Sequence, residues 1–144
     1  MILPIVKAII GPVTATEGSE TGHTKINLDN YRAGREFILT GRSVTNGTAP
    51  GSSKTITLKY YWSDVDFTAG SAAATVLADR VTSLTAKTLS DAADTTQDWQ
   101  FTSSPVRMLA PYCMVTYTVS ALATNADITL TVNHVVVPST YVDL

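Results

Sequence analysis

The chain has 144 residues, a length typical of one domain, and hydrophobic residues make up 44% of it. Its net charge of −2 and its scattered basic residues exclude the basic stripe that nucleic-acid-binding proteins carry. Charged residues account for only 15%, against a usual share of about 25%, so the 23 threonines and 12 serines must supply much of the polar surface.

The N-terminal segment predicts a strand that is apolar on both faces. This strand spans residues 3–10 and is followed by a Gly-Pro turn signal. Pro4 and Lys7 interrupt the apolar run and no basic region precedes it, so it does not match a secretory signal peptide. A strand that is apolar on both faces is buried on both. We expect residues 1–12 to be an interaction arm, with cover by loops of the same domain as the alternative.

Three further strands are predicted before the middle of the chain. They span residues 23–28, 36–44 and 54–62, and loops rich in Gly, Asn, Ser and Pro separate them. In the third strand every second residue from Ile56 to Trp62 is apolar, and threonine, lysine or tyrosine stands between. This period of two predicts a sheet with one dry and one wet face.

The middle of the chain, residues 72–89, carries an ambiguous pattern. A helical stripe of alanine, valine and leucine competes there with several β-favouring threonines, and we predict two short strands. Three more strands follow, at residues 97–102, 112–121 and 127–137. Eight or nine closely spaced strands indicate an all-β fold: a single domain over residues 1–144 that forms an antiparallel, jelly-roll-like two-sheet sandwich.

The end of the last predicted strand is also apolar on both faces, because three valines follow one another there. Exposed apolar surface marks interaction sites, so we expect both chain ends to meet another subunit, with residues 138–144 as a second arm. Deleting residues 1–10 is then expected to leave a folded sandwich that no longer associates. The predicted interface residues are Ile2, Leu3, Ile5, Val6, Ile9, Ile10, Val135, Val137, Tyr141 and Leu144.

The two histidines and the single cysteine do not form a recognisable catalytic or metal site. His23, His134 and Cys113 are too few for the usual four-ligand structural zinc site, and one cysteine forms no internal disulfide. Cys113 and His134 fall on strands that we predict to be adjacent, but no orienting group or oxyanion donor accompanies them. We expect a buried, inert thiol and a core or interface histidine, with no cofactor and no enzymatic activity.

Two other groups of residues suggest binding. Asp64 and Asp66 form an Asp-x-Asp pair that could contribute to a calcium site, although loop carboxylates more often cap turns. Tyr61 is the strand aromatic that we expect to point outward, whereas its neighbours Tyr60 and Trp62 point into the core. An outward ring of this kind is what a carbohydrate-stacking platform requires.

Two segments carry a resemblance to a known group of proteins. Residues 60–67 end a strand in an aromatic–Ser–Asp loop, and residues 104–115 lead through Arg107 and an Ala-Pro-Tyr step into a threonine-rich hairpin. This combination resembles small β-sandwich structural proteins of tailed bacteriophage virions, including the jelly-roll cement or decoration proteins that clamp capsid subunits together. The resemblance implies a non-enzymatic, oligomeric capsid accessory protein whose arms reach neighbouring subunits.

The residues and the resemblance together predict a structural virion protein that cements neighbouring capsid subunits. We expect it at the capsid surface, after synthesis in the host cytoplasm. Its expected partners are the major capsid protein and further copies of itself, as a dimer or higher symmetric oligomer, without nucleic acid or membrane. Two alternatives stay open: a tail-tube, head–tail-joining or baseplate structural protein, and a carbohydrate-binding module.

Overall fold

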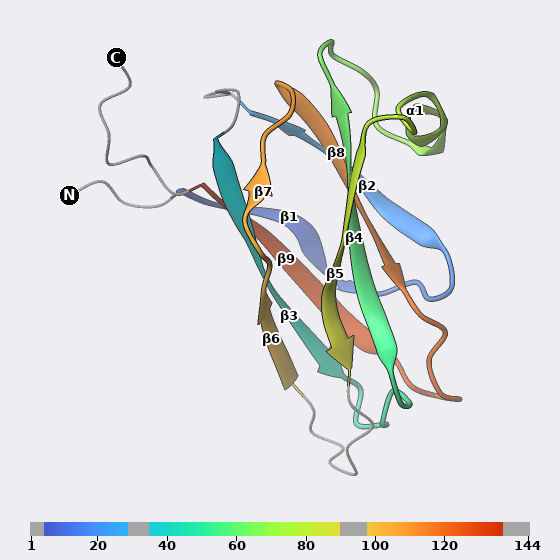
Figure 1. Cartoon of the computed structure of the whole chain (residues 1–144). Coiled ribbons are helices and arrows are strands. Elements are labelled where there is room, and N and C mark those ends of the chain that lie inside the picture. The colour runs from blue at the N-terminus through green and yellow to red at the C-terminus, as the bar shows by residue number, and fades with distance from the viewer. Residues whose placement is uncertain (1–4, 29–34, 90–97, 137–144) are drawn as a thin grey trace, which may run out of the picture.

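Two β-sheets packed face to face make up the computed structural model, which describes residues 5–28, 35–89 and 98–136 (Figure 1). The elements are β1 (Ile5–Thr14), β2 (Glu20–Asn27), β3 (Glu36–Thr45), β4 (Lys54–Ser63), α1 (Ser71–Val76), β5 (Val81–Leu89), β6 (Asp98–Thr102), β7 (Val106–Arg107), β8 (Tyr112–Val119) and β9 (Ile128–Val136). Sheet 1 has the strand order β1-β9-β3-β6, with β7 also paired to β3, and sheet 2 has the order β2-β8-β4-β5.

The strand pairs are nested, as in one long hairpin that has been rolled up. β1 pairs with β9, β2 with β8, β3 with β6 and β7, and β4 with β5, all antiparallel. The roll brings β9 against β3 and β8 against β4, which closes the two sheets. This strand order is that of a jelly roll, so the predicted all-β two-sheet sandwich is confirmed.

The hydrophobic core lies between the sheets because apolar residues take every second position of the central strands. Phe37 of sheet 1 packs edge-on against Tyr60 of sheet 2, with 5.6 Å between the ring centroids. Each large side chain buried in this way contributes about 1.5–3 kcal/mol to folding. The fully buried residues include Trp62, Tyr60, Phe37, Leu39, Ile56, Leu58, Leu130 and Val115.

The prediction of two short strands over residues 72–89 is wrong for its first half. Residues Ser71–Val76 form the helix α1, and β5 follows at Val81–Leu89. Three consecutive alanines, which favour the helix, occupy the centre of α1. None of the helical residues is buried, so no sheet contact selects the extended form there.

The N-terminal strand is longer than predicted and continues through the Gly-Pro step. β1 reaches Thr14 and pairs with β9 along its length, with register shifts between Ala8 and Ile10 and between Ile10 and Val13. Residues 5–12 therefore belong to sheet 1 and are not an arm. Deleting residues 1–10 would remove six of the ten residues of this edge strand, so we now expect the deletion to destabilise the sandwich.

Two smaller differences concern β2 and β7. β2 begins at Glu20, three residues before the predicted strand, because a register shift between Thr21 and Thr24 lets the strand pass Gly22. The two-residue strand β7 was not predicted, since Val106–Arg107 is too short to show an alternation.

Candidate interaction surface

The outer face of sheet 1 is a broad surface on which uncharged side chains outnumber charged ones. We call it the open face. Its side chains point away from the core because their strand neighbours, such as Leu39 and Leu130, are buried. The residues of the open face are Ala8 and Thr14 of β1, Thr129, Thr131, Asn133 and Val135 of β9, Glu36, Ile38, Thr40, Arg42 and Val44 of β3, Asp98, Gln100 and Thr102 of β6, and Arg107 of β7.

The open face carries a single described ion pair, and that pair lies at its edge. Arg42 donates two hydrogen bonds to Asp98, one from Nη2 to Oδ2 at 2.5 Å and one from Nε to Oδ1 at 2.9 Å. The Arg42 guanidinium holds the pKa of Asp98 below its usual value, so both groups stay charged and neutralise each other. Two further charged residues, Glu36 and Arg107, stand opposite one another where β3 pairs with β7. The rest of the face presents mainly hydroxyls and amides, which cost less to desolvate against a partner than charges do.

Towards the end of β9 the hydroxyl-bearing side chains of the open face give way to the aliphatic residues Val135 and Ile38, which lie at the same end as the charged Glu36 and Arg107. Val135 is paired in register with Ile38 of β3 on one side and with Val6 of β1 on the other. Val135 is buried and Ile38 is half-buried. The first residue of β1, Ile5, pairs with Val136, so the described chain enters and leaves the sandwich at this aliphatic end.

The structure divides the predicted interface residues into three groups. Ile9 and Ile10 belong to the hydrophobic core, because the register shift in β1 turns both of them inward. Ile5, Val6 and Val135 lie at the aliphatic end of the β1–β9 pair. The remaining ones lie outside the described residues: Ile2, Leu3, Val137, Tyr141 and Leu144.

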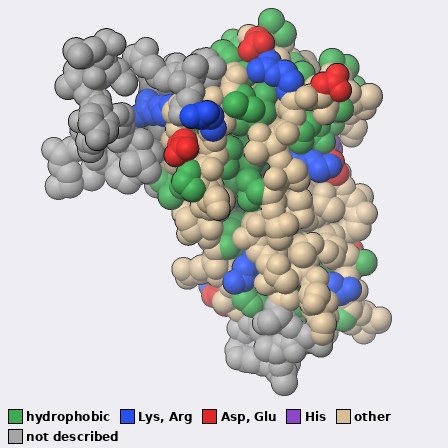
Figure 2. Space-filling model, viewed as in Figure 1, with side chains coloured by type: hydrophobic (Ala, Val, Ile, Leu, Met, Phe, Trp, Pro, Cys, Tyr) green, Lys and Arg blue, Asp and Glu red, His purple; other side chains and the backbone are tan. Residues whose placement is uncertain are grey.

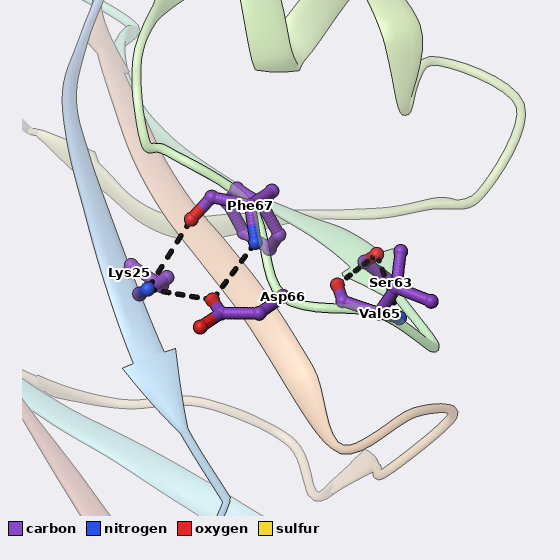
Figure 3. Close-up of polar contacts among 5 residues, drawn as sticks. All are labelled: Lys25, Ser63, Val65, Asp66 and Phe67. Atoms are coloured by element: carbon purple, nitrogen blue, oxygen red, sulfur yellow. Dashed lines mark hydrogen bonds and ion pairs between the residues drawn. The ribbon is translucent and has the colours of Figure 1, made fainter.

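The outer face of sheet 2, in contrast, is partly covered by the connection between β4 and β5. Figure 3 shows how this connection is held: Lys25 of β2 donates to Asp66 Oδ1 at 2.7 Å and to the Phe67 carbonyl oxygen at 3.2 Å. The Lys25 ammonium also lies 5.9 Å from the centroid of the Phe67 ring, within cation–π range. Ser63 fixes the start of the connection through hydrogen bonds with the Val65 carbonyl and amide. Met114, on the same outer face, is fully buried.

A second polar cluster on sheet 2 centres on the Glu20 carboxylate. Tyr61 and Thr116 donate hydroxyl hydrogen bonds to Glu20 Oε1 at 2.5 and 2.9 Å, and Lys59 donates to Oε2 at 3.2 Å. Burial raises the pKa of Glu20, but these three donors outweigh it and hold the pKa below its usual value. The cluster joins β2, β8 and β4 and so fixes their register. Sequence reasoning missed it because Glu20 fell in a predicted loop.

The residues weighed for catalysis do not come together. Cys113 lies on β8 in sheet 2 and His134 on β9 in sheet 1, so the prediction that their strands are adjacent is wrong. Cys113 is fully buried, as predicted, and burial raises the pKa of its thiol to about 12, which keeps it protonated. His134 is a core residue, as predicted, with its ring edge-on to Phe37 at 4.2 Å between centroids.

The acidic pair is neutralised within the domain. Asp66 is bound by Lys25, and Asp64 accepts a hydrogen bond from Arg80 at 2.8 Å. In the part of the chain that the structure describes, no group of three or more His, Cys, Asp or Glu side chains could hold a metal ion.

The candidate carbohydrate platform is not presented to solvent. Tyr61 is on the outer face of sheet 2, as expected, but it is only 5% exposed and its hydroxyl is bound to Glu20. Tyr60 and Trp62 are fully buried. A carbohydrate-binding role therefore lacks an exposed stacking ring on this strand.

Comparison of the chain with models of protein families, with curated proteins and with solved structures found no match. Within the described ranges, no helix is long and apolar enough to cross a membrane.

Proposed function

We propose that this protein is a structural component of a bacteriophage virion that cements neighbouring capsid subunits. The observation that carries the proposal is the open face of sheet 1, a sheet surface of mainly hydroxyl and amide side chains whose charged residues lie at its margins. The jelly-roll strand order agrees with it, because this architecture recurs in viral capsid domains, although a fold alone does not fix a function.

Adhesion to a shell needs a surface of this kind. A face of mainly hydroxyl and amide side chains can be desolvated at lower cost than a charged one, and each Å² of apolar surface that a partner covers contributes about 25 cal/mol. Repetition over the many identical sites of a shell multiplies a weak contact into a strong one. The partner that fits is the major capsid protein, at the outer capsid surface.

The test is co-sedimentation of the purified protein with empty shells assembled from the major capsid protein of the same genome. The wild-type protein is expected to sediment with the shells. Thr131→Lys places a charge at the centre of the open face and is expected to abolish binding with little loss of thermal stability, because Thr131 is half-buried on the outer face and the lysine side chain is long enough to reach solvent. Thr57→Lys on the outer face of sheet 2 is the matched control, which should bind as the wild type does. Equal binding of both variants to the shells would contradict a role of the open face in shell binding.

A tail or head–tail-joining role is the second candidate, and the same open face supports it. Rings of the isolated protein in negative-stain images, together with no binding to empty shells, would favour that role over cementing.

A further inference from the structure

The Asn46 side chain joins two connections at one end of the sandwich. Asn46 follows β3 directly, and its side chain contacts the loop that leads from β8 into β9, at the lower end of the molecule in Figure 1. Asn46 Nδ2 donates to the Asn125 carbonyl oxygen at 2.9 Å. Asn46 Oδ1 accepts hydrogen bonds from the Thr48 and Asp127 amides, each at 3.2 Å. We call these three hydrogen bonds the Asn46 latch, which needs an amide side chain because one end donates and the other accepts.

The residue after Asn46 makes this side-chain amide chemically labile. Asn46 and Gly47 form the only Asn-Gly step of the sequence, and both residues are exposed to water. Asparagine is among the thermolabile residues. Glycine has no Cβ atom, so its backbone nitrogen can approach the preceding side chain closely. The reacting atoms are all held in the folded domain, because the latch binds both ends of the Asn46 amide and the Gly47 amide donates to Thr45 Oγ1 at 3.4 Å.

We propose that Asn46 is a deamidation site that the folded domain holds closed, and that the reaction opens the latch irreversibly. The Gly47 nitrogen, after losing its proton to solvent, attacks Cγ of Asn46 and forms a new C–N bond in a succinimide ring. The bond between Cγ and Nδ2 breaks, and the leaving nitrogen takes up a proton and departs as ammonia. Water then opens either carbonyl of the ring and leaves aspartate or isoaspartate in place of Asn46. The sequence of steps consumes water, releases ammonia and involves no oxidation.

The latch must open before the ring can close. Ring closure draws Cγ onto the Gly47 nitrogen and turns Oδ1 and Nδ2 of Asn46 away from their partners. A local opening of this kind costs less than global unfolding, so the folded protein reacts slowly instead of being inert. Three hydrogen bonds of ordinary strength should slow deamidation roughly 10–1,000-fold relative to the unfolded chain.

The product of the reaction cannot close the latch again. A carboxylate has no hydrogen to donate, so an oxygen atom stands opposite the Asn125 carbonyl oxygen where Nδ2 was bound. Isoaspartate in addition inserts its Cβ atom into the main chain and displaces Gly47 from its place after β3.

The opened segment is the end of the pair formed by β3 and β9, the two central strands of sheet 1. The Asn46 amide continues this ladder by donating to the Asp127 carbonyl oxygen at 3.0 Å. Figure 2 shows few acidic side chains over the lower half of the viewed face, and deamidation adds one negative charge to a chain whose net charge is −2. The reaction therefore changes both the local charge and the order of this end of the sheet.

Peptide mass spectrometry of the purified protein at mildly alkaline pH tests the site. One sample is kept folded in buffer and the other is unfolded in urea. The unfolded chain is expected to deamidate at Asn46 before its other asparagines, and the folded chain roughly 10–1,000-fold more slowly. Equal rates in the two states, or no reaction at Asn46 in the unfolded chain, would overturn the proposal.

Gly47→Ala in urea is the matched control, and its folding does not matter there. The added methyl group hinders the attacking nitrogen, so deamidation at Asn46 should slow at least about tenfold. An unchanged rate in this variant would reject the succinimide route.

Amide hydrogen exchange connects the reaction to the latch without mutation. The Thr48 and Asp127 amides are bound to Asn46 Oδ1, so their protection measures how often the latch opens. The slowing of exchange at these two amides should match the slowing of deamidation in the folded protein. Deamidation that is much faster than this protection allows would place the reaction in the closed state and contradict the proposal.

Asn46→Asp reproduces one product and tests the irreversible opening. The variant should keep its circular dichroism spectrum, while protection of the Thr48 and Asp127 amides falls roughly 5–30-fold. Thr124→Asp adds the same charge at an exposed position of the β8–β9 loop and should leave this protection unchanged. Unchanged protection in Asn46→Asp, or an equal loss in both variants, would show that deamidation does not open the latch.

Discussion

Two neighbouring tyrosines of β4 are expected to respond in opposite ways to the same substitution. Tyr61 donates its hydroxyl to the Glu20 carboxylate at 2.5 Å, on the outer face of sheet 2. Tyr60 points into the core, where its buried hydroxyl has no hydrogen-bond partner in the described part of the chain. Replacement by phenylalanine removes one oxygen from each and leaves both rings in place.

The magnitudes follow from these contacts. A hydrogen bond to a charged group contributes about 1.5–3 kcal/mol, so Tyr61→Phe should lower the melting temperature by about 3–12 °C for a domain of this size. An unsatisfied buried hydroxyl costs about 1–3 kcal/mol, so Tyr60→Phe should raise the free energy of unfolding by an amount in this range.

Urea unfolding followed by tryptophan fluorescence measures both changes, with an unchanged slope as the check that only stability differs. The change in the free energy of unfolding of the double variant should equal the sum of the changes in the two single variants, because the hydroxyls lie on opposite faces of the sheet. A Tyr60→Phe variant that is destabilised as much as Tyr61→Phe would refute the assignment of the two faces.

Three further predictions concern the same fold. Burial and the hydrogen bond to Glu20 raise the pKa of Tyr61 to about 12. The stability that the Tyr61 hydroxyl contributes should therefore be complete below pH 10 and lost as the pH rises through about 12. The free energies of unfolding of the wild type and Tyr61→Phe, measured by urea titration, should converge across this window. Gly41→Ala should cost about 1–3 kcal/mol, since a Cβ atom there would overlap the Phe101 ring, and a calorimetric melting temperature equal to that of the wild type would contradict this packing. Ser103→Ala should cost about 1–3 kcal/mol in urea unfolding because the buried Ser103 hydroxyl accepts the Leu39 amide at 2.9 Å, and an unchanged midpoint would count against that bond.

Strands were predictable wherever one face of the sheet is buried and the other is not. The alternation from Ile56 to Trp62 predicts β4 and its inner face, and both are confirmed. The alternation does not report which strands become neighbours, so Cys113 and His134 were assigned to adjacent strands although they lie in different sheets. The strand order depends on which nested strand pairs come together in the tertiary structure, and the local pattern of apolar residues does not specify this.

The chain ends illustrate a second limit. Apolar residues on both faces of the N-terminal segment suggested a partner, but the register shift after Ala8 turns Ile9 and Ile10 into the core. A bulge of one residue reverses the faces that follow it, and the sequence carries no strong signal for it. The hydroxyl positions Thr129 and Thr131 were visible as the polar side of the last strand, but their place on the open face depends on the strand order.

A cryo-electron microscopy map of empty shells incubated with the protein tests the central claim most directly. The account predicts sandwich-shaped density at the junctions between capsid subunits, with the outer face of sheet 1 directed at the shell and β5 turned away from it. Shells without added density, or density in which the outer face of sheet 2 contacts the shell, would contradict it.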